Sequence, residues 1–224
     1  MAISIAIDGP AAAGKSTVAK KVSEKLGYTY IDTGAMYRAF TQYVISKGVN
    51  PENEEAVSKL VPEVMIELRP DGTVLCNKTD VTEIIRRDNV SHNVSFIASY
   101  KAVRLALVDQ QRLMASKSSV VMDGRDIGTY VLPNATVKIF QIASVATRAV
   151  RRYEENIQKN RPCTLEEVEQ DIRRRDHIDS HREFAPLKPA PDSVWLDTSF
   201  MSIDEAVEAV LKIIKTKTEE RDEK

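Results

Sequence analysis

The chain has 224 residues, 42% of them hydrophobic, so it is long enough to bury a sizeable core, as one domain or as a core carrying smaller inserts. Its 32 basic and 33 acidic residues nearly cancel, which excludes an overall field that would draw the chain to nucleic acid or to an anionic membrane. Two cysteines, Cys76 and Cys163, lie far apart and have no C-x-x-C companion, which argues against a disulfide framework or a metal knuckle.

The first segment reads as a strand, a phosphate loop and the start of a helix. Residues 3–8 are an apolar run, and residues 9–17 follow as Gly-Pro-Ala-Ala-Ala-Gly-Lys-Ser-Thr, which fits the pattern G-x-x-x-x-G-K-[ST]. The glycines let the backbone curl so that successive N–H groups and the helix N-terminus point at one anion. Lys15 would add charge at the β- and γ-phosphates of a nucleotide, and the Ser16 hydroxyl would take a place on Mg²⁺.

A chance glycine turn before a helix is the alternative, but strand, loop, Lys-Ser and helix all occur in the required order. The segment therefore predicts binding of a nucleoside triphosphate. No basic stretch followed by an apolar signal core stands at the start of the sequence, and no run of about 18 apolar residues occurs. We expect a cytoplasmic protein.

Strand and helix patterns alternate along most of the chain. Val18, Val22 and Leu26 form one helical stripe, Gly27 is placed to end that helix, and residues 28–32 read as a strand. Further strand-like runs at 119–123, 136–142 and 193–197 alternate with helical stretches at 101–117, 145–159 and from a capping box at 202–205 onward. This order predicts a parallel sheet of about five strands with right-handed crossovers.

Two segments interrupt the alternation. Residues 64–68 and 73–76 read as strands joined by the turn at 69–72, and an antiparallel hairpin inside an α/β chain indicates an inserted subdomain. Residues 156–164 are polar, contain Pro162 and join two Arg-rich helices, which is typical of a mobile flap.

The helix that begins near Thr164 carries an unusual stripe. Residues 164–167 form a capping box, and an apolar stripe runs through Leu165, Val168 and Ile172. Three charged residues continue the same face: Arg175, Asp179 and Arg182. A solvated face with ion pairs is one interpretation, but such pairs belong on the opposite face. We favour a ligand cleft lined by these three residues.

Two more clusters follow predicted strands, and ligands of parallel sheets bind beyond the carboxyl ends of the strands. Asp123, Arg125 and Asp126 stand directly after an apolar strand, although Asp123 could be only a turn former. After the second strand, Arg38 could grip a phosphate, and Tyr37 could present its ring to a base or simply pack in the core.

Two motifs are interpreted as coincidences. Residues 77–80 match the N-K-x-D motif with which GTPases read guanine, but here it precedes the acidic strand end and lies beside a hairpin, which is the wrong order. His177 and His181 have the spacing of helical zinc ligands but lack the intervening catalytic Glu, so we expect a solvated helix face.

A phosphate loop, arginines spread over several segments and a flap indicate phosphoryl transfer between two bound molecules, shielded from water. Over almost its full length, the chain resembles the bacterial cytidylate kinase family. The resemblance rests on I-D-G-P-A-A-A-G-K-S-T at 7–17, D-T-G-A-M-Y-R at 32–38, D-G-R-D-I-G-T at 123–129 and R-R-D-H-I-D-S-H-R at 174–182. Family members commonly have Gly at the position of Ala12 and Gly-Thr in place of Ser16-Thr17; neither change removes a main-chain donor.

The resemblance implies an α/β fold with a P-loop three-layer core, an inserted NMP-binding subdomain that holds the antiparallel hairpin, and a short helical lid. The implied boundaries are 1–32, 101–150 and 183–224 for the core, 33–100 for the NMP-binding subdomain, and 151–182 for the lid and Arg-rich helix. It further implies phosphorylation of CMP and dCMP with ATP as donor and Mg²⁺ as cofactor, by a cytoplasmic monomer that binds neither nucleic acid nor membrane.

The resemblance also assigns residues. The ATP site would be Gly9, Pro10, Ala11, Ala12, Ala13, Gly14, Lys15, Ser16 and Thr17, with Ser16 on Mg²⁺. The catalytic residues would be Lys15, Arg125, Arg148 and Arg152, with Arg151 a further candidate. The CMP site would be Thr33, Tyr37, Arg38, Ser95, Arg104, Asp123, Arg125, Asp126, Arg175, Asp179 and Arg182.

Within that CMP site, the resemblance gives each group of residues a part of the nucleotide. Arg38, Arg125 and Arg175 would bind the acceptor phosphate. Asp179 and Arg182 would bind the sugar. Ser95, Arg104 and Asp126 would read the base, because a carboxylate can accept from the cytosine amine, where uracil has a carbonyl.

Two other functions stay open. One is a UMP/CMP or other small-molecule kinase on the same scaffold, which nucleotide selectivity would separate. The other is a nucleotide-dependent switch or binding protein without an acceptor, which would hydrolyse ATP slowly and respond to no monophosphate.

Overall fold

The computed structural model describes residues 2–222, which fall into two compact units. The phosphate-loop unit contains the residues through Tyr30, Ser118–His181 and the residues from Ala185 onward. The hairpin unit contains Ile31–Lys117 and Arg182–Phe184. In this described part of the chain, no helix is both long and apolar enough to cross a membrane.

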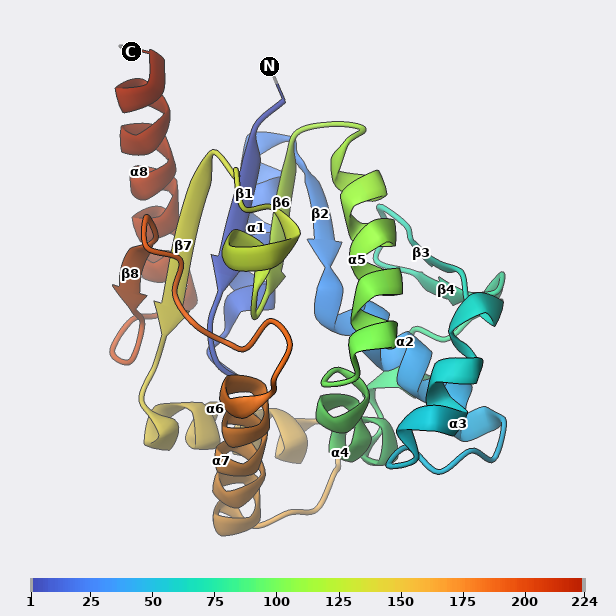
Figure 1. Cartoon of the computed structure of the whole chain (residues 1–224). Helices are drawn as coiled ribbons and strands as arrows, with labels where there is room; N and C mark the ends of the chain where they lie inside the picture. Colours follow the sequence, from blue (N-terminus) through green and yellow to red (C-terminus); the bar gives the residue numbers. More distant parts are fainter. Residues whose placement is uncertain (1, 223–224) are drawn as a thin grey trace. The chain divides into compact units, whose positions relative to one another are not determined.

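The phosphate-loop unit contains most of a five-stranded sheet in the order β2-β6-β1-β7-β8 (Figure 1), and the last two residues of β2 group with the hairpin unit. Its strands are β1 (Ser4–Asp8), β2 (Thr29–Asp32), β6 (Val120–Gly124), β7 (Val137–Ile142) and β8 (Val194–Asp197). Strands β6 and β7 pair with β1 in parallel, and β8 pairs with β7 in parallel. The predicted α/β fold with a parallel sheet of about five strands is confirmed.

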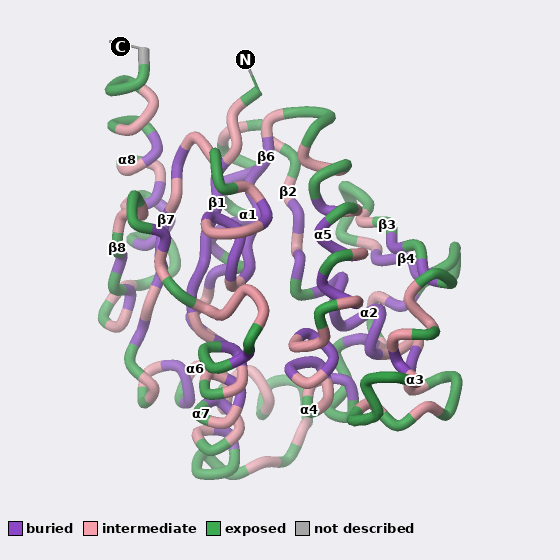
Figure 2. Tube along the Cα trace, in the orientation of Figure 1, coloured by how far each residue is buried: buried purple, intermediate pink, exposed green. Residues whose placement is uncertain are grey.

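Two helices cover one face of this sheet, α1 (Lys15–Leu26) and α8 (Ile203–Asp222) (Figure 1). Val18 and Val22 of α1 pack in one cluster with Ile7 of β1 and Val210 of α8, and the central strands are buried (Figure 2). Gly27 ends α1 in the left-handed conformation, with φ 67°, as predicted. The opposite face carries η3 (Ile127–Val131), a π-helical turn that the sequence did not predict.

Helices α6 (Val145–Gln158) and α7 (Leu165–His181) pack against each other. Ala149, Val168 and Ile172 form their shared apolar cluster. The predicted capping box before α7 is confirmed, because Glu167 N donates to Thr164 Oγ1 at 3.2 Å and Thr164 N donates to Glu167 Oε2 at 2.8 Å. Motion of the segment between the two helices stays a prediction.

The hairpin unit contains four helices: α2 (Thr33–Ser46), α3 (Glu54–Lys59), α4 (Asp88–Ile97) and α5 (Lys101–Ala115). It also contains the short 3-10 turns η1 (Val61–Glu63) and η2 (Ile84–Arg86). The predicted hairpin is confirmed, since β3 (Ile66–Leu68) pairs antiparallel with β4 (Val74–Cys76). A third strand, β5 (Thr79–Asp80), pairs antiparallel with β4 and was not predicted.

The predicted division into core, NMP-binding subdomain and lid stays a prediction. Residues 101–117, predicted as part of the P-loop core, group with the hairpin unit. The reason is the apolar face of α5, where Val103 and Leu107 pack in one buried cluster with Met36 and Phe40 of α2.

The N-K-x-D match at 77–80 is explained by this hairpin. Asn77 and Lys78 both adopt positive φ, 50° and 67°, in the two-residue turn between β4 and β5. The Asn77 side chain accepts from Met65 N at 2.9 Å and donates to Glu63 O at 2.8 Å. The asparagine therefore shapes the turn, which agrees with the interpretation of this motif as a coincidence.

Candidate active site

The phosphate loop runs from the end of β1 to the start of α1. At Gly9, with φ 152°, a Cβ atom would lie 1.9 Å from the carbonyl oxygen of Gln141, so only glycine fits. Gly14 precedes α1 with φ 82°, and neither a capping side chain nor an acidic residue covers the first turn of the helix. Ala12 has φ 57°, a conformation in which glycine carries no strain. The loop thus ends at a helix N-terminus suited to an anion.

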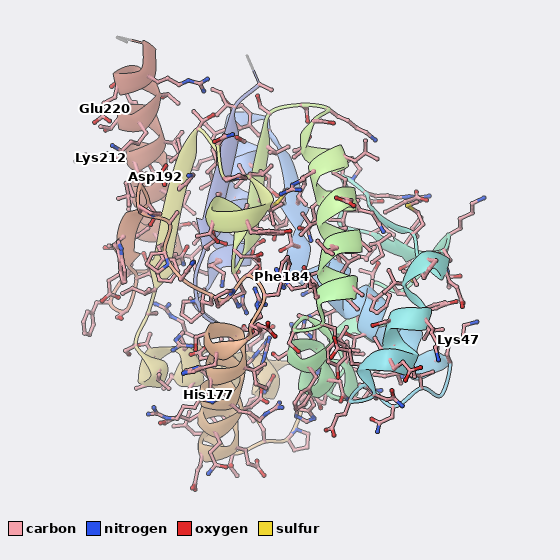
Figure 3. All side chains as sticks on the ribbon, viewed as in Figure 1. Lys47, His177, Phe184, Asp192, Lys212 and Glu220 are labelled. Carbon is pink, nitrogen blue, oxygen red and sulfur yellow. The ribbon has the colours of Figure 1, made fainter. Side chains whose placement is uncertain are left out.

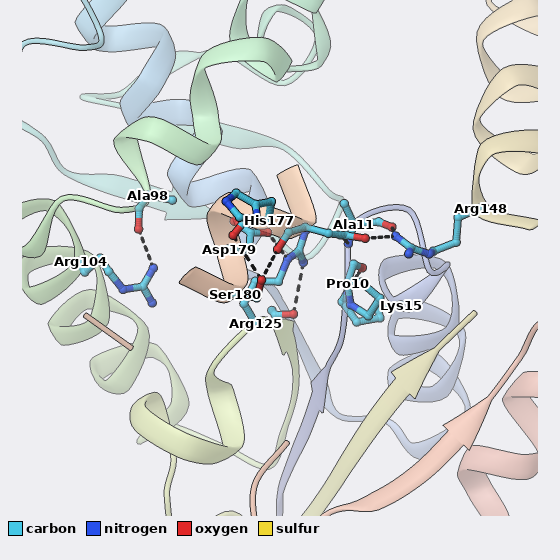
Figure 4. A network of polar contacts seen from close by, with 12 residues as sticks. Pro10, Ala11, Lys15, Ala98, Arg104, Arg125, Arg148, His177, Asp179 and Ser180 are labelled. Atoms are coloured by element: carbon cyan, nitrogen blue, oxygen red, sulfur yellow. Dashed lines mark hydrogen bonds and ion pairs between the residues drawn. The ribbon is translucent and has the colours of Figure 1, made fainter. Parts of the chain in front are cut away.

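Lys15 is folded back onto this loop. Its Nζ donates to the carbonyl oxygen of Pro10 at 2.7 Å, and the residue is only 4% exposed (Figure 4). Burial, and after it the nearby Arg125 guanidinium, lower the pKa of Lys15 to about 7, against the opposite effects of Asp123, Asp8 and Asp179. An ammonium group held there is poorly solvated, which strengthens its interaction with any bound phosphate.

Ser16 and Asp123 join the first turn of α1 to the end of β6. Ser16 Oγ donates to Asp123 Oδ2 at 2.8 Å, and the Tyr30 hydroxyl donates to Asp123 Oδ1 at 2.8 Å. A hydroxyl and a carboxylate are the oxygen ligands that a phosphate-loop protein offers to Mg²⁺. The sequence analysis assigned Asp123 to the CMP site, and this contact puts it beside the phosphate loop.

Arg125, Asp179 and Arg175 form a charged cluster in which Asp179 and Arg175 are buried and the Arg125 side chain is 22% exposed. Arg125 Nε donates to Asp179 Oδ2 at 2.8 Å (Figure 4). Arg175 is 8% exposed, and its Nε has no hydrogen-bond partner among the described residues. Burial lowers the pKa of Arg175, and the like charge of Arg125 lowers it further. This cluster brings two guanidinium groups together with one carboxylate, which is bonded to Arg125, an arrangement that favours an anionic ligand.

The charged stripe of α7 is only partly as predicted. Val168, Ile172, Arg175 and Asp179 are the buried residues of α7, so the apolar stripe does continue into buried charge. Arg182 lies beyond the last residue of the helix, and it groups with the hairpin unit. It is buried there as well.

Of the three arginines on α6, one touches the phosphate loop. Arg148 Nη1 donates to Ala11 O at 2.8 Å and to Asp176 Oδ2 at 2.6 Å (Figure 4). Asp176 Oδ1 in turn accepts from Ala11 N at 3.0 Å. Arg152 pairs with Glu155 on its own helix, and Arg151 donates to the carbonyl oxygens that follow β8, at Thr198 and Met201.

The other predicted CMP residues in the hairpin unit are buried: Thr33, Tyr37, Arg38, Ser95 and Arg104. Arg38 Nη1 donates to Ser91 Oγ at 2.8 Å, and Arg104 Nη1 donates to Ala98 O at 2.9 Å. The Arg104 guanidinium lies 5.2 Å from the centre of the Tyr37 ring. Tyr37 also belongs to the apolar core cluster of this unit, which supports the packing interpretation, while a contact of its ring with a base stays a prediction.

Three residues near the loop were missed by the sequence analysis. Asp176 has just been described. Gln141 of β7 donates through Nε2 to Ala13 O at 2.8 Å and so helps to hold the loop in place. Asp8, the last residue of β1, accepts from Ile127 N and Gly128 N, and burial raises its pKa to about 7 although both hydrogen bonds lower it. No local sequence pattern marks these contacts.

His177 and His181 both belong to α7. His177 lies on α7 (Figure 3), and its ring stacks on that of His181 with centroids 4.1 Å apart. Both are exposed, as expected. Within residues 2–222, no group of three or more His, Cys, Asp and Glu side chains is arranged to hold a metal ion.

Known proteins match this chain along nearly its full length. The family model described as cytidylate kinase matches residues 5–216. The cytidylate kinase of Geobacillus kaustophilus is 53% identical over 215 residues, which are 95% of this chain and 96% of that protein. The cytidylate kinase of Bacillus subtilis is 51% identical over 219 residues, which are 96% of this chain and 98% of that protein.

Among solved structures, an uncharacterized protein from Eubacterium ventriosum aligns with a TM-score of 0.53 at 15% identity, covering 96% of this chain and 99% of that one. At this identity the likeness shows the fold alone. The family match and the relatives more than 50% identical show the family as well as the fold. They agree with the resemblance that the motifs indicated. The chain is a kinase, and it belongs to the cytidylate kinase family.

Proposed function

We propose that this enzyme transfers the terminal phosphoryl group of ATP directly to CMP, and to dCMP, in a Mg²⁺-dependent site closed to water. Membership of the family supports phosphorylation of a nucleoside monophosphate. The observation that carries the proposal is the buried Arg175 guanidinium beside Arg125, in the same unit as the phosphate loop. A protein that only hydrolysed or sensed ATP would need no second anion site.

The donor nucleotide would bind the loop at 9–17. The loop N–H groups and the N-terminus of α1 would hold the phosphates, and Lys15 would move from Pro10 O to them. Ser16 and Asp123 fit Mg²⁺, because this ion keeps several waters and binds through few protein oxygens together with substrate phosphates. When bound, Mg²⁺ neutralises charge on the phosphates.

The acceptor phosphate would bind Arg125 and Arg175, together with Arg38. The guanidinium fork of Arg125 is already aimed by the Asp179 carboxylate. Asp179 and Arg182 would bind the sugar, with Thr33 and Tyr37 contributing contacts nearby. Because Arg175 is buried without a hydrogen bond at Nε, an incoming phosphate would satisfy a group that the protein leaves unsatisfied.

The base would be read by Asp126, Ser95 and Arg104. Asp126 is 3% exposed, so an acceptor aimed at the cytosine amine would be largely desolvated. Uracil would present a carbonyl to the same carboxylate. Such a mismatch leaves polar groups unpaired or facing like charge, and it disfavours uracil.

Transfer itself needs positioning rather than a strong base, because the attacking phosphate oxygen is already ionised. Arg148 is the arginine best placed to stabilise the transferred group, since it is bonded to Ala11 of the loop. Arg152 would join it only after leaving Glu155. Asp176 holds Arg148 and the Ala11 N–H together and so orders this part of the site.

The direct test is product analysis. The enzyme is incubated with ATP, Mg²⁺ and CMP, and nucleotides are separated and quantified over time. Equal amounts of ADP and CDP support the proposal. ADP with free phosphate and no CDP would contradict it and would favour the switch or binding protein. Monomeric state and cytoplasmic location stay predictions.

A further inference from the structure

Asp8 is a buried carboxylate that the proposed mechanism does not use. It is the last residue of β1, the strand at the centre of the sheet, and it is 4% exposed. Its Oδ1 accepts from Ile127 N at 2.8 Å, and its Oδ2 accepts from Gly128 N at 2.7 Å. One carboxylate therefore engages two consecutive backbone donors that lie far from it in sequence.

These donors begin the turn η3, directly after Arg125 and Asp126. The first N–H groups of a helical turn have no partner within the turn, so the Asp8 carboxylate acts as its N-terminal cap. The turn is closed by Tyr130 N and Val131 N, which both donate to Asp126 O, at 2.8 Å and 3.1 Å. The backbone after Arg125 and Asp126 is thus held at the start of η3 by Asp8 and at its end by the hydrogen bonds to Asp126 O.

The fit leaves little room for another side chain. A Cβ atom at Gly128 would lie 3.4 Å from Asp8 Oδ2, an ordinary contact, and 3.2 Å from the Lys138 side chain, which would have to shift slightly. An asparagine at position 8 would offer one acceptor and one donor to two N–H groups. One backbone donor would then face an amide N–H. Only a carboxylate satisfies both.

The position is also costly for a charged group. Burial, with a smaller effect of neighbouring Asp126, raises the pKa of Asp8 to about 7, against the opposing effects of the two N–H donors and Lys15. A residue that served the fold alone would be better replaced by an apolar side chain with a differently closed turn. The geometry points to a role in the site.

We propose that Asp8 is a positioning residue of the acceptor site: its carboxylate fixes the start of η3 and thereby the directions in which the Arg125 and Asp126 side chains point. The inference rests on the proposed function, in which these two residues contact CMP. In this proposal Asp8 itself contacts neither substrate. Its other neighbour in sequence is Gly9 of the phosphate loop, so the competing role is support of ATP binding.

The test compares Asp8→Asn with Asp197→Asn. Asp197 is a matched control because it also ends a strand of the same sheet and accepts from a backbone N–H, that of Ser199 at 2.8 Å, but on an exposed edge. KM for CMP is measured at saturating ATP, and KM for ATP at saturating CMP. Hydrogen exchange of the Ile127 and Gly128 amides is followed by NMR.

For Asp8→Asn we expect a rise of at least about tenfold in KM for CMP, a change below about twofold in KM for ATP, and faster exchange at both amides. The control should match the wild type. An unchanged KM for CMP, or equal rises for CMP and ATP, would overturn the inference. A wild type that makes no CDP would instead refute the proposed function, which separates the two failures.

If Asp8→Asn does not fold, the wild type provides the test. Binding of CMP should slow exchange of the Ile127 and Gly128 amides by at least about tenfold, because the acceptor orders the residues that this turn positions, whereas ATP alone should not. Exchange that responds to ATP and not to CMP would overturn the inference.

Discussion

The Lys15 ammonium group donates a 2.7 Å hydrogen bond to the carbonyl oxygen of Pro10, inside the loop that would hold ATP. The lysine is buried in the loop, with 4% of its surface exposed. Its charge is costly in the folded protein, because burial lowers its pKa from 10.5 to about 7. Replacing this lysine by an apolar residue should therefore lower activity without lowering stability.

Lys15→Met should lower kcat by at least about 100-fold, the effect of losing one preorganised charge on the transferred group. Its melting temperature at pH 7 should stay equal or rise. The folded protein binds the lysine proton less tightly than the unfolded chain, so the destabilisation is full below pH 7 and disappears only above about pH 10.5. Lys20→Met, at an exposed position of α1, is the control. Near-normal turnover of Lys15→Met with CMP would refute the phosphate-loop assignment.

Arg175→Met should raise KM for CMP by about 10- to 100-fold, the value of hydrogen bonds to a charged group, and leave KM for ATP unchanged. Stability should not fall, because a buried guanidinium with an unsatisfied Nε is replaced by an apolar side chain of similar length. Arg173→Met serves as control, since Arg173 is exposed on the same helix and pairs with Glu169. A large loss of melting temperature with unchanged kinetics would mean that Arg175 has only a structural role.

Asp126→Ala should lower kcat/KM for CMP. It should also lower the ratio of kcat/KM for CMP to kcat/KM for UMP. Removing the carboxylate removes the penalty on a base that presents a carbonyl, worth about 1 to 3 kcal/mol. Both substrates are measured on wild type and variant at saturating ATP and Mg²⁺. If the CMP-to-UMP ratio does not move, base choice lies elsewhere, and Ser95 and Arg104 are the next candidates.

The Asp8 carboxyl predicts a pH dependence of stability. Its pKa is about 7 in the folded protein against an ordinary 3.8, so the folded state holds this proton more tightly and loses stability as pH rises between those values. Over the two pH units from 5 to 7, at 1.36 kcal/mol each, wild type should lose about 2 to 3 kcal/mol relative to Asp8→Asn. Urea unfolding at pH 5 and pH 8 measures this difference. A difference that is the same at both pH values would show that burial does not shift this group.

Local sequence patterns predicted the fold well where a single helix or strand has one regular spacing of apolar residues. The helix stripe that Gly27 ends, the hairpin at 64–76 and the capping boxes before α7 and α8 are all present. The strand β5 escaped because Thr79–Asp80 is two exposed polar residues, without an alternating pattern. The turn η3 escaped because its cap, Asp8, lies 119 and 120 residues from the amides that it accepts from.

Separation along the sequence also distinguishes the candidate site residues that were named from the sequence from those that were not. Lys15, Ser16, Arg125 and Asp179 lie in motifs whose spacing carries their chemistry. Asp176 looked like one more charge on a charged helix, and only contact with Ala11, 165 residues away, distinguishes it. For Arg151, nothing in an Arg-rich helix indicates that it donates to the carbonyl oxygens after β8, and its contact with a phosphate stays a prediction.

The most direct measurement of the central claim is ADP formation from ATP and Mg²⁺ against a panel of acceptors, CMP, dCMP, UMP and AMP, with a reaction without acceptor as baseline. Specificity constants are compared on one enzyme preparation. We expect CMP and dCMP to accelerate ADP formation far above the baseline, with UMP and AMP well below them. Preference for UMP or AMP, or no acceleration by any monophosphate, would contradict the assignment of this chain as an enzyme that phosphorylates CMP.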